Sequence, residues 1–242
     1  MLGIKELVAK LEGVTKYTGD VCVFRLKLAE PFPFQPGQFV MVSLPNHQDA
    51  NGRKISKAYS IASAQNGILE LCIVMYPGGA LSPFLFAKNI GDEVIITGPY
   101  GMFTMRKPVV PGTVFIGGGT GLAPLMSMLR SLYNEGYAEK LWLFYSMGSP
   151  QLFLFREELL SFSAKKNLQL IASTSIADGI WNFEKGRVTD TFPRFLPQLK
   201  QDGIPNASRQ FYICGPPLLV TDTVRMLEEL GFRKENIHME KW

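Results

Sequence analysis

The stretch Thr113-Val-Phe-Ile-Gly-Gly-Gly-Thr-Gly-Leu-Ala-Pro124 decides the fold of the second half of the chain. It reads as a buried strand, a turn with four glycines in five residues, and the start of a helix. Residues without side chains let a pyrophosphate approach the backbone, and a helix N-terminus supplies free N–H groups. Pro124 stands where the dinucleotide fingerprint has Gly or Ala, but proline is tolerated in the first helical turn. The stretch therefore predicts a phosphate-binding turn, with a purely structural strand–helix turn as the alternative.

The rest of the second half repeats this succession of strand and helix. Buried strands that alternate with helices are typical of a parallel sheet covered on both faces. A strand order of 3-2-1-4-5 would bring the glycine turn and the chain after residue 214 to the point where the order reverses, and open α/β sheets bind ligands there. We expect five strands at 113–116, 141–145, 168–172, 210–214 and 237–240, and helices at 122–133, 153–162, 188–199 (broken at Pro193) and 218–230.

The first half of the chain has a different pattern. Short runs alternate between apolar and polar residues, most clearly over Asp20–Ala29, where the even-numbered residues 22–28 are all apolar and share one face. Similar runs lie at Phe39–Leu44, Leu69–Met75 and Glu93–Thr97. Several short strands with Gly and Pro between them predict an antiparallel β-barrel of Greek-key type. Because the pattern changes just after residue 107, we expect two domains, residues 1–107 and 108–242.

Composition excludes several classes of protein. The 242 residues carry a net charge of +4, which is too small to indicate nucleic-acid binding. The three cysteines lie far apart and there are two histidines, so we expect no disulfide framework, iron–sulfur cluster or other metal site. No apolar run is long enough to span a membrane, and Lys5 and Glu6 interrupt the run that a signal peptide needs. We expect a soluble protein of a reducing compartment, the cytoplasm.

Two stretches of the first half carry candidate ligand-binding residues. Lys57-Ala58-Tyr59-Ser60 offers a cation for a phosphate, a ring that can stack on a heterocycle and a hydroxyl donor, although an ordinary strand can have the same sequence. Gly78-Gly79-Ala80-Leu81-Ser82-Pro83 predicts a helix that begins with Ser82 as N-cap and Pro83 in its first turn. The N–H groups at this helix start form a second candidate anion site, and a capped helix without a ligand is the alternative.

The second half ends with three further candidates. Cys214-Gly215-Pro216-Pro217 follows a strand and opens a helix, so Cys214 lies either near a nicotinamide or in the core as a small apolar residue. Glu240 lies at the end of the last strand, where ligands of open sheets bind, and a solvated carboxylate is the alternative. Trp242 either covers a ligand or caps the surface.

Taken together and in this order, these blocks resemble the ferredoxin–NADP reductase family. Its members hold FAD on an antiparallel barrel and NAD(P)H on the α/β domain that follows. Trp181 and Gly186–Val188 are also similar to the family's loop before its fourth strand. The resemblance covers nearly the whole chain and rests on six blocks, which are Lys57–Ser60, Gly78–Ser82, Gly98–Gly101, Gly117–Pro124, Cys214–Pro217 and Glu240–Trp242.

The resemblance implies that the barrel holds FAD. Tyr59 would stack on the isoalloxazine ring, and Ser60 would hydrogen-bond near N5, the atom that accepts hydride. Lys57 would face the phosphates, and the backbone from Ile73 through Met75 would line the flavin. The residues implied to hold the FAD pyrophosphate are Gly79, Ala80, Leu81 and Ser82.

The resemblance also implies roles in the second domain. Glu240 would relay protons near N5, and Trp242 would cover a cofactor ring. The NAD(P) pyrophosphate would be held by Gly118, Gly119, Thr120 and Gly121, and the nicotinamide would be flanked by Cys214, Gly215 and Pro216. The residues expected in catalysis are therefore Tyr59, Ser60, Cys214 and Glu240.

Two positions depart from the family pattern. Lys57 stands where the family usually has Arg, so the grip on the pyrophosphate lacks a bidentate fork or is shared with Arg53. Gly148 stands where a second Arg is usual, which mildly favours NADH. The choice between NADH and NADPH stays open, because no carboxylate for the ribose and no nearby Arg other than Arg156 follows the second strand of this domain.

The resemblance implies a flavoprotein oxidoreductase that takes hydride from NAD(P)H onto bound FAD and passes single electrons to a separate protein. Because the chain has no cysteine cluster, we expect the acceptor to be another molecule, an acidic ferredoxin or flavodoxin. Residues 1–110 hold 11 Lys and Arg against 8 Asp and Glu, which is compatible with an acidic partner. Two alternatives stay open, an NAD(P)H:flavin reductase that releases reduced flavin and an electron-transfer subunit of a larger complex. The acceptor and the oligomeric state are also undecided, and so is the use of FMN instead of FAD, although the sequence favours FAD.

Overall fold

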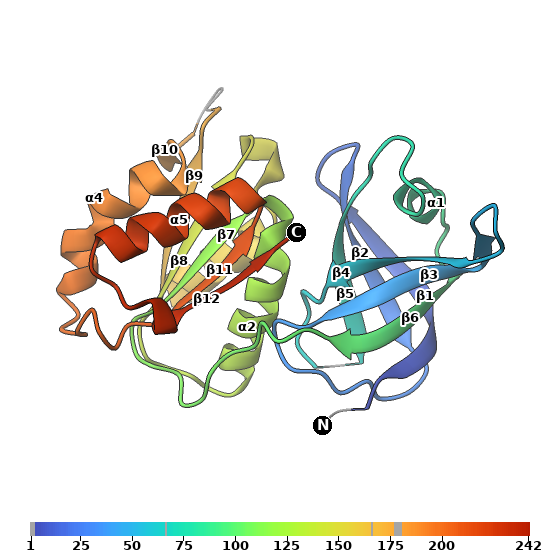
Figure 1. The fold of residues 1–242 in the computed structure, drawn as a ribbon, viewed down its shortest axis with the longest axis horizontal. Coiled ribbons are helices and arrows are strands. Elements are labelled where there is room, and N and C mark those ends of the chain that lie inside the picture. The colour runs from blue at the N-terminus through green and yellow to red at the C-terminus, as the bar shows by residue number, and fades with distance from the viewer. Residues whose placement is uncertain (1–2, 66, 166, 177–180) are drawn as a thin grey trace. The chain divides into compact units, whose positions relative to one another are not determined.

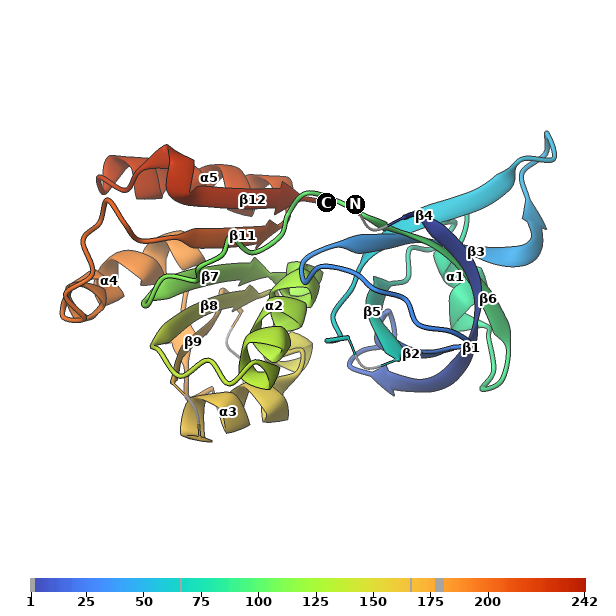
Figure 2. The same ribbon diagram turned by 90° about the horizontal axis from the view of Figure 1, so that it is seen from below.

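The computed structural model describes residues 3–65, 67–165, 167–176 and 181–242, and its contacts divide the chain into two units. The first unit holds residues 1–104 together with 126–132, and the second holds 105–125 and 133–242. The division at residue 104 lies close to the expected boundary after residue 107, which stays a prediction. Each unit is described by itself (Figures 1 and 2).

The first unit is an antiparallel barrel, as predicted. Its sheet has the order β4-β3-β6-β1-β2-β5, and the pairing of β1 with β6, β2 with β5 and β3 with β6 makes Greek-key connections. An antiparallel bridge between Ile61 and Leu71 links the chain after β4 to β5, so the two edges of the sheet meet. The elements are β1 Lys5–Lys16, β2 Val21–Leu28, β3 Phe39–Gln48, β4 Lys54–Ser60, β5 Ile68–Val74, β6 Glu93–Tyr100 and the short helix α1 Ser82–Phe86.

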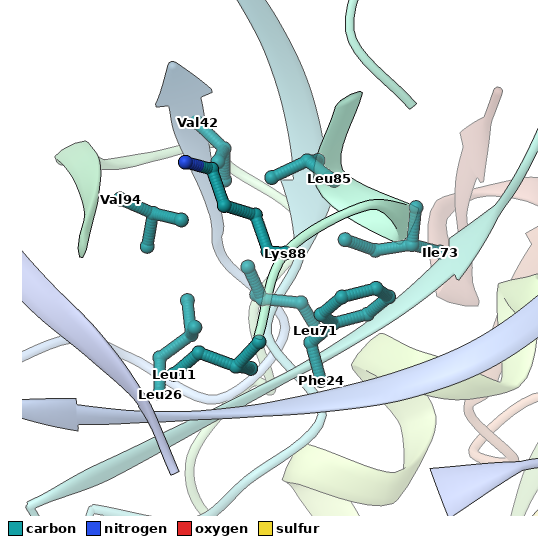
Figure 3. Close-up of a pocket in the computed structure, with 9 residues that line it drawn as sticks. All are labelled: Leu11, Phe24, Leu26, Val42, Leu71, Ile73, Leu85, Lys88 and Val94. Atoms are coloured by element: carbon teal, nitrogen blue, oxygen red, sulfur yellow. The ribbon is translucent and has the colours of Figure 1, made fainter. Parts of the chain in front are cut away.

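Alternation of side chains explains these strands. In β2, Cys22, Phe24 and Leu26 lie in the barrel core, while Arg25 and Lys27 are exposed. The core is filled, since the cavity in Figure 3 measures about 10 Å³, room for about one water. Its lining is apolar except for Lys88. This cavity therefore has no space for a cofactor, and a large ligand would have to bind elsewhere on the unit.

The second unit is a parallel sheet with helices. Its order is β10-β9-β8-β7-β11-β12, and every pair of neighbours is parallel. The prediction of five strands was wrong by one, because β10 has only two residues and therefore no periodic pattern. The five expected strands do follow the order 3-2-1-4-5, so the order reverses between β7 and β11. The strands are β7 Thr113–Gly118, β8 Leu141–Met147, β9 Leu168–Thr174, β10 Glu184–Lys185, β11 Phe211–Gly215 and β12 Ile237–Lys241.

The helices follow the predicted succession. In Figure 1, α4 and α5 lie in front of the sheet. Helix α4 runs through Pro193, where a break was expected, because its apolar face with Val188, Phe192 and Leu199 is buried in the same core cluster as strand residues of β7, β8 and β11. The helices are α2 Leu122–Asn134, α3 Arg156–Lys165, α4 Val188–Lys200 and α5 Pro217–Glu229, with single 3₁₀ turns at η1 Gly119–Gly121, η2 Pro150–Leu152 and η3 Lys234–Asn236.

A buried ion pair fixes the amino-terminal ends of β7 and β11. The Arg209 guanidinium is fully buried and donates to both carboxylate oxygens of Asp202, at 2.6 and 3.0 Å. It also donates to the carbonyl oxygens of Gly112 at 2.7 Å and Leu199 at 3.0 Å. These hydrogen bonds lower the pKa of Asp202 although burial alone would raise it. One side chain thus ties the start of β7, the end of α4 and the segment before β11.

Candidate functional site

The two loops at the reversal point of the parallel sheet touch through their backbones. A Cβ atom on Gly121 would lie 2.4 Å from the carbonyl oxygen of Cys214 and 2.6 Å from the amide nitrogen of Gly215. A Cβ atom on Gly215 would lie 3.2 Å from the Cα atom of Gly118. These three glycines are therefore needed for the packing of the loops, a reason that the sequence alone did not reveal. The loops lie where open sheets bind their ligands.

Gly119 differs from its neighbours. Its φ of +53° is a conformation that favours glycine, and the nearest side-chain atom to an added Cβ would be Cζ2 of Trp242 at 3.9 Å. The Trp242 side chain is 50% exposed. Open space beside Gly119, bounded by an indole ring, suits the approach of a phosphate or ring to the backbone. The structure thus brings together the predicted residues Gly118, Gly119, Gly121, Cys214, Gly215, Pro216 and Trp242.

Cys214 and Glu240 face each other on β11 and β12. They are register partners, and Cys214 is 1% exposed. Burial, with a smaller contribution from the Glu240 carboxylate, strongly raises the pKa of the Cys214 thiol. Burial also raises the pKa of Glu240. The thiol is therefore a neutral, unreactive group, while the carboxyl group takes up a proton more readily than a solvated one would.

The predicted flavin-binding residues of β4 lie at the end of that strand. Tyr59 is half-buried against the barrel core, and burial raises the pKa of its phenol to about 12. Lys57 is exposed and makes no ion pair with any residue that the structure describes. The Ile73 side chain is inside the barrel core, so only its backbone is free to line a ligand, and the Met75 amide donates to the Asp20 carbonyl oxygen.

The loop between β5 and α1 has the features of a phosphate cradle. Gly78 has a φ of +75°, and a Cβ atom on Gly79 would lie 2.9 Å from the Tyr76 carbonyl oxygen. The amides of Ala80, Leu81 and Ser82 donate to no acceptor among the described residues. Three consecutive free donors beside glycines fit a pyrophosphate. The residues present therefore fit the FAD that the sequence implies.

Ser82 does not have its predicted role as N-cap. The N-cap of α1 is Leu81, and Ser82 is the first helical residue. Its hydroxyl oxygen accepts a hydrogen bond from the Tyr76 amide at 3.0 Å, which closes the turn over Gly78 and Gly79. The hydroxyl oxygen is therefore an acceptor inside the loop, and Ser82 can offer a ligand its amide and its O–H group.

Two further residues of the barrel bear on this loop. His47, which the sequence analysis did not single out, places its Nε2 atom 2.7 Å from the Ala80 carbonyl oxygen. Arg53 was expected to share the grip on the pyrophosphate, but its guanidinium pairs with Asp49 at 2.9 Å across the turn between β3 and β4. Lys57 therefore keeps its role as candidate phosphate cation without help from Arg53.

Comparisons with known proteins agree with this division into two binding domains. A model of the oxidoreductase FAD-binding domain matches residues 8–105, and a model of the oxidoreductase NAD-binding domain matches residues 115–225. A relative described as ferredoxin–NADP reductase B, from Sorangium cellulosum (strain So ce56), is 31% identical over 87% of this chain and 86% of its own length. The chain belongs to the ferredoxin–NADP reductase family.

Other members of the ferredoxin–NADP reductase family extend the comparison. The reductase component of propane 2-monooxygenase from Rhodococcus jostii (strain RHA1) is 31% identical over 99% of this chain. A ferredoxin NADP⁺ reductase from Neisseria gonorrhoeae with bound FAD and NADP has the same fold, with a TM-score of 0.84, 24% identity and 98% of both chains covered. The chain spans 63–68% of the length of the first curated relatives that it matches. In this family the first unit is an FAD-binding domain and the second an NAD(P)-binding domain.

The described residues hold few other candidate sites. No group of three or more His, Cys, Asp and Glu side chains that could hold a metal ion lies among the described residues. None of the helices that the structure describes is long and apolar enough to cross a membrane. A groove of about 490 Å³ in the first unit is lined by residues 28–34, 65, 67 and 68, and none of these is a predicted site residue.

Proposed function

We propose that this chain is an NAD(P)H-dependent reductase that uses bound FAD to pass electrons to a separate carrier protein. The observation that carries the proposal is the presence, in one chain, of two glycine-lined backbone cradles. One is the loop Gly78–Ser82 with its three free amides, and the other is the pair of touching loops at the reversal point of the parallel sheet. Each cradle fits a pyrophosphate, and FAD and NAD(P)H each carry one.

In the proposed reaction the protein supplies position and electrostatics. Bound FAD supplies the exchange between a two-electron donor and a one-electron acceptor. The Tyr59 phenol stays neutral because its pKa is about 12, so the ring can lie against the flavin without introducing a charge. The Cys214 thiol stays protonated beside the nicotinamide, where a thiolate would be a competing nucleophile. Glu240, with its raised pKa, is the residue that would hold or release a proton, and Ser60 is the donor near N5.

The partner is proposed from chemistry and from the names of relatives. The Rhodococcus relative is the reductase component of a monooxygenase, and the Sorangium relative is named for ferredoxin. These names support an electron carrier or oxygenase component as the acceptor, and the positive excess of residues 1–110 supports an acidic one. We also propose the cytoplasm as the location, the domain boundary after residue 107, and either NADH or NADPH as the reductant.

A spectrum and two titrations test the proposal. The purified protein should keep a yellow flavin through gel filtration, or take up FAD when it is supplied. NADH or NADPH should then bleach the flavin band, and the reduced protein should reduce ferricyanide and a 2Fe–2S ferredoxin. A preparation that binds no flavin contradicts the proposal. A protein that loses its flavin on gel filtration and oxidises NAD(P)H only with excess free flavin is a flavin reductase instead. A flavin-loaded protein that reduces neither ferricyanide nor ferredoxin is a subunit of a larger complex.

A further inference from the structure

His47 is placed by an irregularity in strand β3. The register between β3 and β4 shifts between Ser43 and Gln48, which marks a β-bulge or a similar irregularity. Asn46, within it, has a φ of 59°, a left-handed conformation that only a few per cent of non-glycine residues adopt. Bulges of this kind redirect the side chain that follows, and they are frequent beside functional sites. Asparagine is among the non-glycine residues that adopt this conformation most readily, so Asn46 can turn the chain just before His47.

The His47 ring is held by two contacts with the segment that contains the FAD cradle. Its Nε2 atom lies 2.7 Å from the Ala80 carbonyl oxygen. A carbonyl oxygen only accepts, so Nε2 must carry the hydrogen. The ring also lies against Phe84 of α1, with centroids 4.2 Å apart. His47 therefore fixes the peptide group of Ala80 from one side and the first turn of α1 from the other.

The fixed peptide lies within the run of free donors. The carbonyl group of Ala80 belongs to the same peptide unit as the amide of Leu81, and a peptide unit is planar. A hydrogen bond that holds the Ala80 carbonyl oxygen therefore also fixes the direction of the Leu81 N–H bond. The Ser82 hydroxyl, which accepts from Tyr76, fixes the other end of the loop. Without His47, the peptide between Ala80 and Leu81 could rotate and the row of donors would be lost.

We propose that His47 is a positioning residue that holds the loop Gly78–Ser82 ready for the second phosphate of FAD, and so sets a preference for FAD over FMN. The inference rests on the proposed function, because the loop matters to a flavin only if FAD binds there. FMN has one phosphate and no adenosine, so it makes fewer contacts with this loop than FAD does, and its affinity depends more on Tyr59 and Ser60. The residue acts through the Ala80 peptide and does not touch the reacting atoms.

Binding titrations of the flavin-free protein test this proposal. His47→Asn keeps a polar side chain but has no donor at the Nε2 position, whereas His47→Gln places its amide nitrogen there. His47→Phe keeps the ring against Phe84 without the donor. Asn51→Ala is the matched control, since Asn51 is exposed in the same β3–β4 turn and, among the described residues, only its backbone amide is hydrogen-bonded. FAD and FMN dissociation constants are measured by quenching of flavin fluorescence, and folding is checked by thermal unfolding without flavin.

The loss of one hydrogen bond predicts a dissociation constant for FAD that rises roughly fivefold in His47→Asn and His47→Phe. The constant for FMN should stay within about twofold. His47→Gln should restore FAD binding, and Asn51→Ala should bind both flavins as the wild type does. Equal weakening of FAD and FMN, unchanged FAD binding, or failure of His47→Gln to restore it would each overturn the proposal. If the wild type binds FAD but the variants give one of these three contrary results, the role of His47 is overturned and the proposed function stands. If the wild type binds no flavin, the proposed function is overturned together with the role of His47.

Discussion

Replacement of Gly121 by alanine should destabilise the second unit strongly. The added Cβ would lie 2.4 Å from the Cys214 carbonyl oxygen, where an ordinary contact needs at least 3.4 Å, so a backbone shift of about 1 Å is required. The three nearest atoms all belong to the backbone of Cys214 and Gly215. They lie in β11, which is paired on both sides, with β7 and β12, and cannot yield easily. Overpacking typically costs about 1–3 kcal/mol, and we expect the upper end here.

The tryptophans of the chain provide the assay. All three, Trp142, Trp181 and Trp242, belong to the second unit, so the unfolding of that unit can be followed by their fluorescence. A loss of about 3 kcal/mol corresponds to a fall of roughly 6–12 °C in its Tm. Gly148→Ala is the control, because the nearest atom to its added Cβ is Cδ1 of Leu152 at 3.8 Å, and it should change stability by less than about 0.5 kcal/mol. A Gly121→Ala protein with the Tm and NAD(P)H affinity of the wild type would refute the close approach of the two loops.

Three further substitutions test other parts of the structure. Lys57→Ala should raise the FAD dissociation constant up to about fivefold, as expected for an exposed ion pair, with a smaller effect on the FMN dissociation constant. Fluorescence titration measures both constants, and equal effects would show that Lys57 does not contact the second phosphate of FAD. Tyr59→Ala should weaken flavin binding about tenfold or more and change the flavin spectrum, so an unchanged spectrum and flavin content would remove Tyr59 from the stack. Because the folded-state pKa of Asp202 is lowered, its pairing with Arg209 stabilises the second unit above the ordinary carboxyl pKa and is lost as pH falls toward the lowered value. Asp202→Asn should lower the free energy of unfolding by about 3–5 kcal/mol at pH 7 and remove the fall of the urea midpoint that this pair causes at acidic pH. An unchanged urea midpoint at pH 7 would show that the pair is dispensable.

The parts of the fold that could be predicted from sequence are the elements with a regular pattern of apolar residues over a short stretch of chain. The alternation in β2 predicts a strand with one face in the core, and the apolar runs of β7 and β8 predict strands buried on both faces. The structure confirms these three strands. Strand β1 was not predicted although Leu7, Ala9 and Leu11 are buried at alternate positions, because the apolar Val8 lies on the exposed face and interrupts the apolar–polar pattern. The two-residue β10 is too short to give any pattern, since its pairing with β9 depends on the fold around it.

The candidate site shows the same limit. The glycines of the turn after β7 were predicted from their number, but the backbone approach that requires Gly121 comes from residues 214–215, about 90 positions away in the chain. His47 could not be selected because its role depends on a bulge and on a carbonyl group of a distant loop. Ser82 has a residue type and spacing typical of an N-cap, but the nearby Tyr76 amide takes its hydroxyl. Local sequence indicates which backbone is free to bind, and tertiary contacts decide which side chains support it.

The location of the Arg209 clasp has a consequence for how this protein can change. The buried guanidinium anchors the strands at their amino-terminal ends, whereas the cofactor loops follow their opposite, carboxyl-terminal ends. Structural integrity and nucleotide recognition are therefore carried by opposite edges of one sheet. We expect that exchange of exposed residues after β8, such as Gly148 and Arg156, leaves the anchor intact, so these positions are the ones to vary in a test of the choice between NADH and NADPH. Substitutions should therefore be tolerated better at the carboxyl-terminal edge of the sheet than at the amino-terminal edge, where Arg209 is buried.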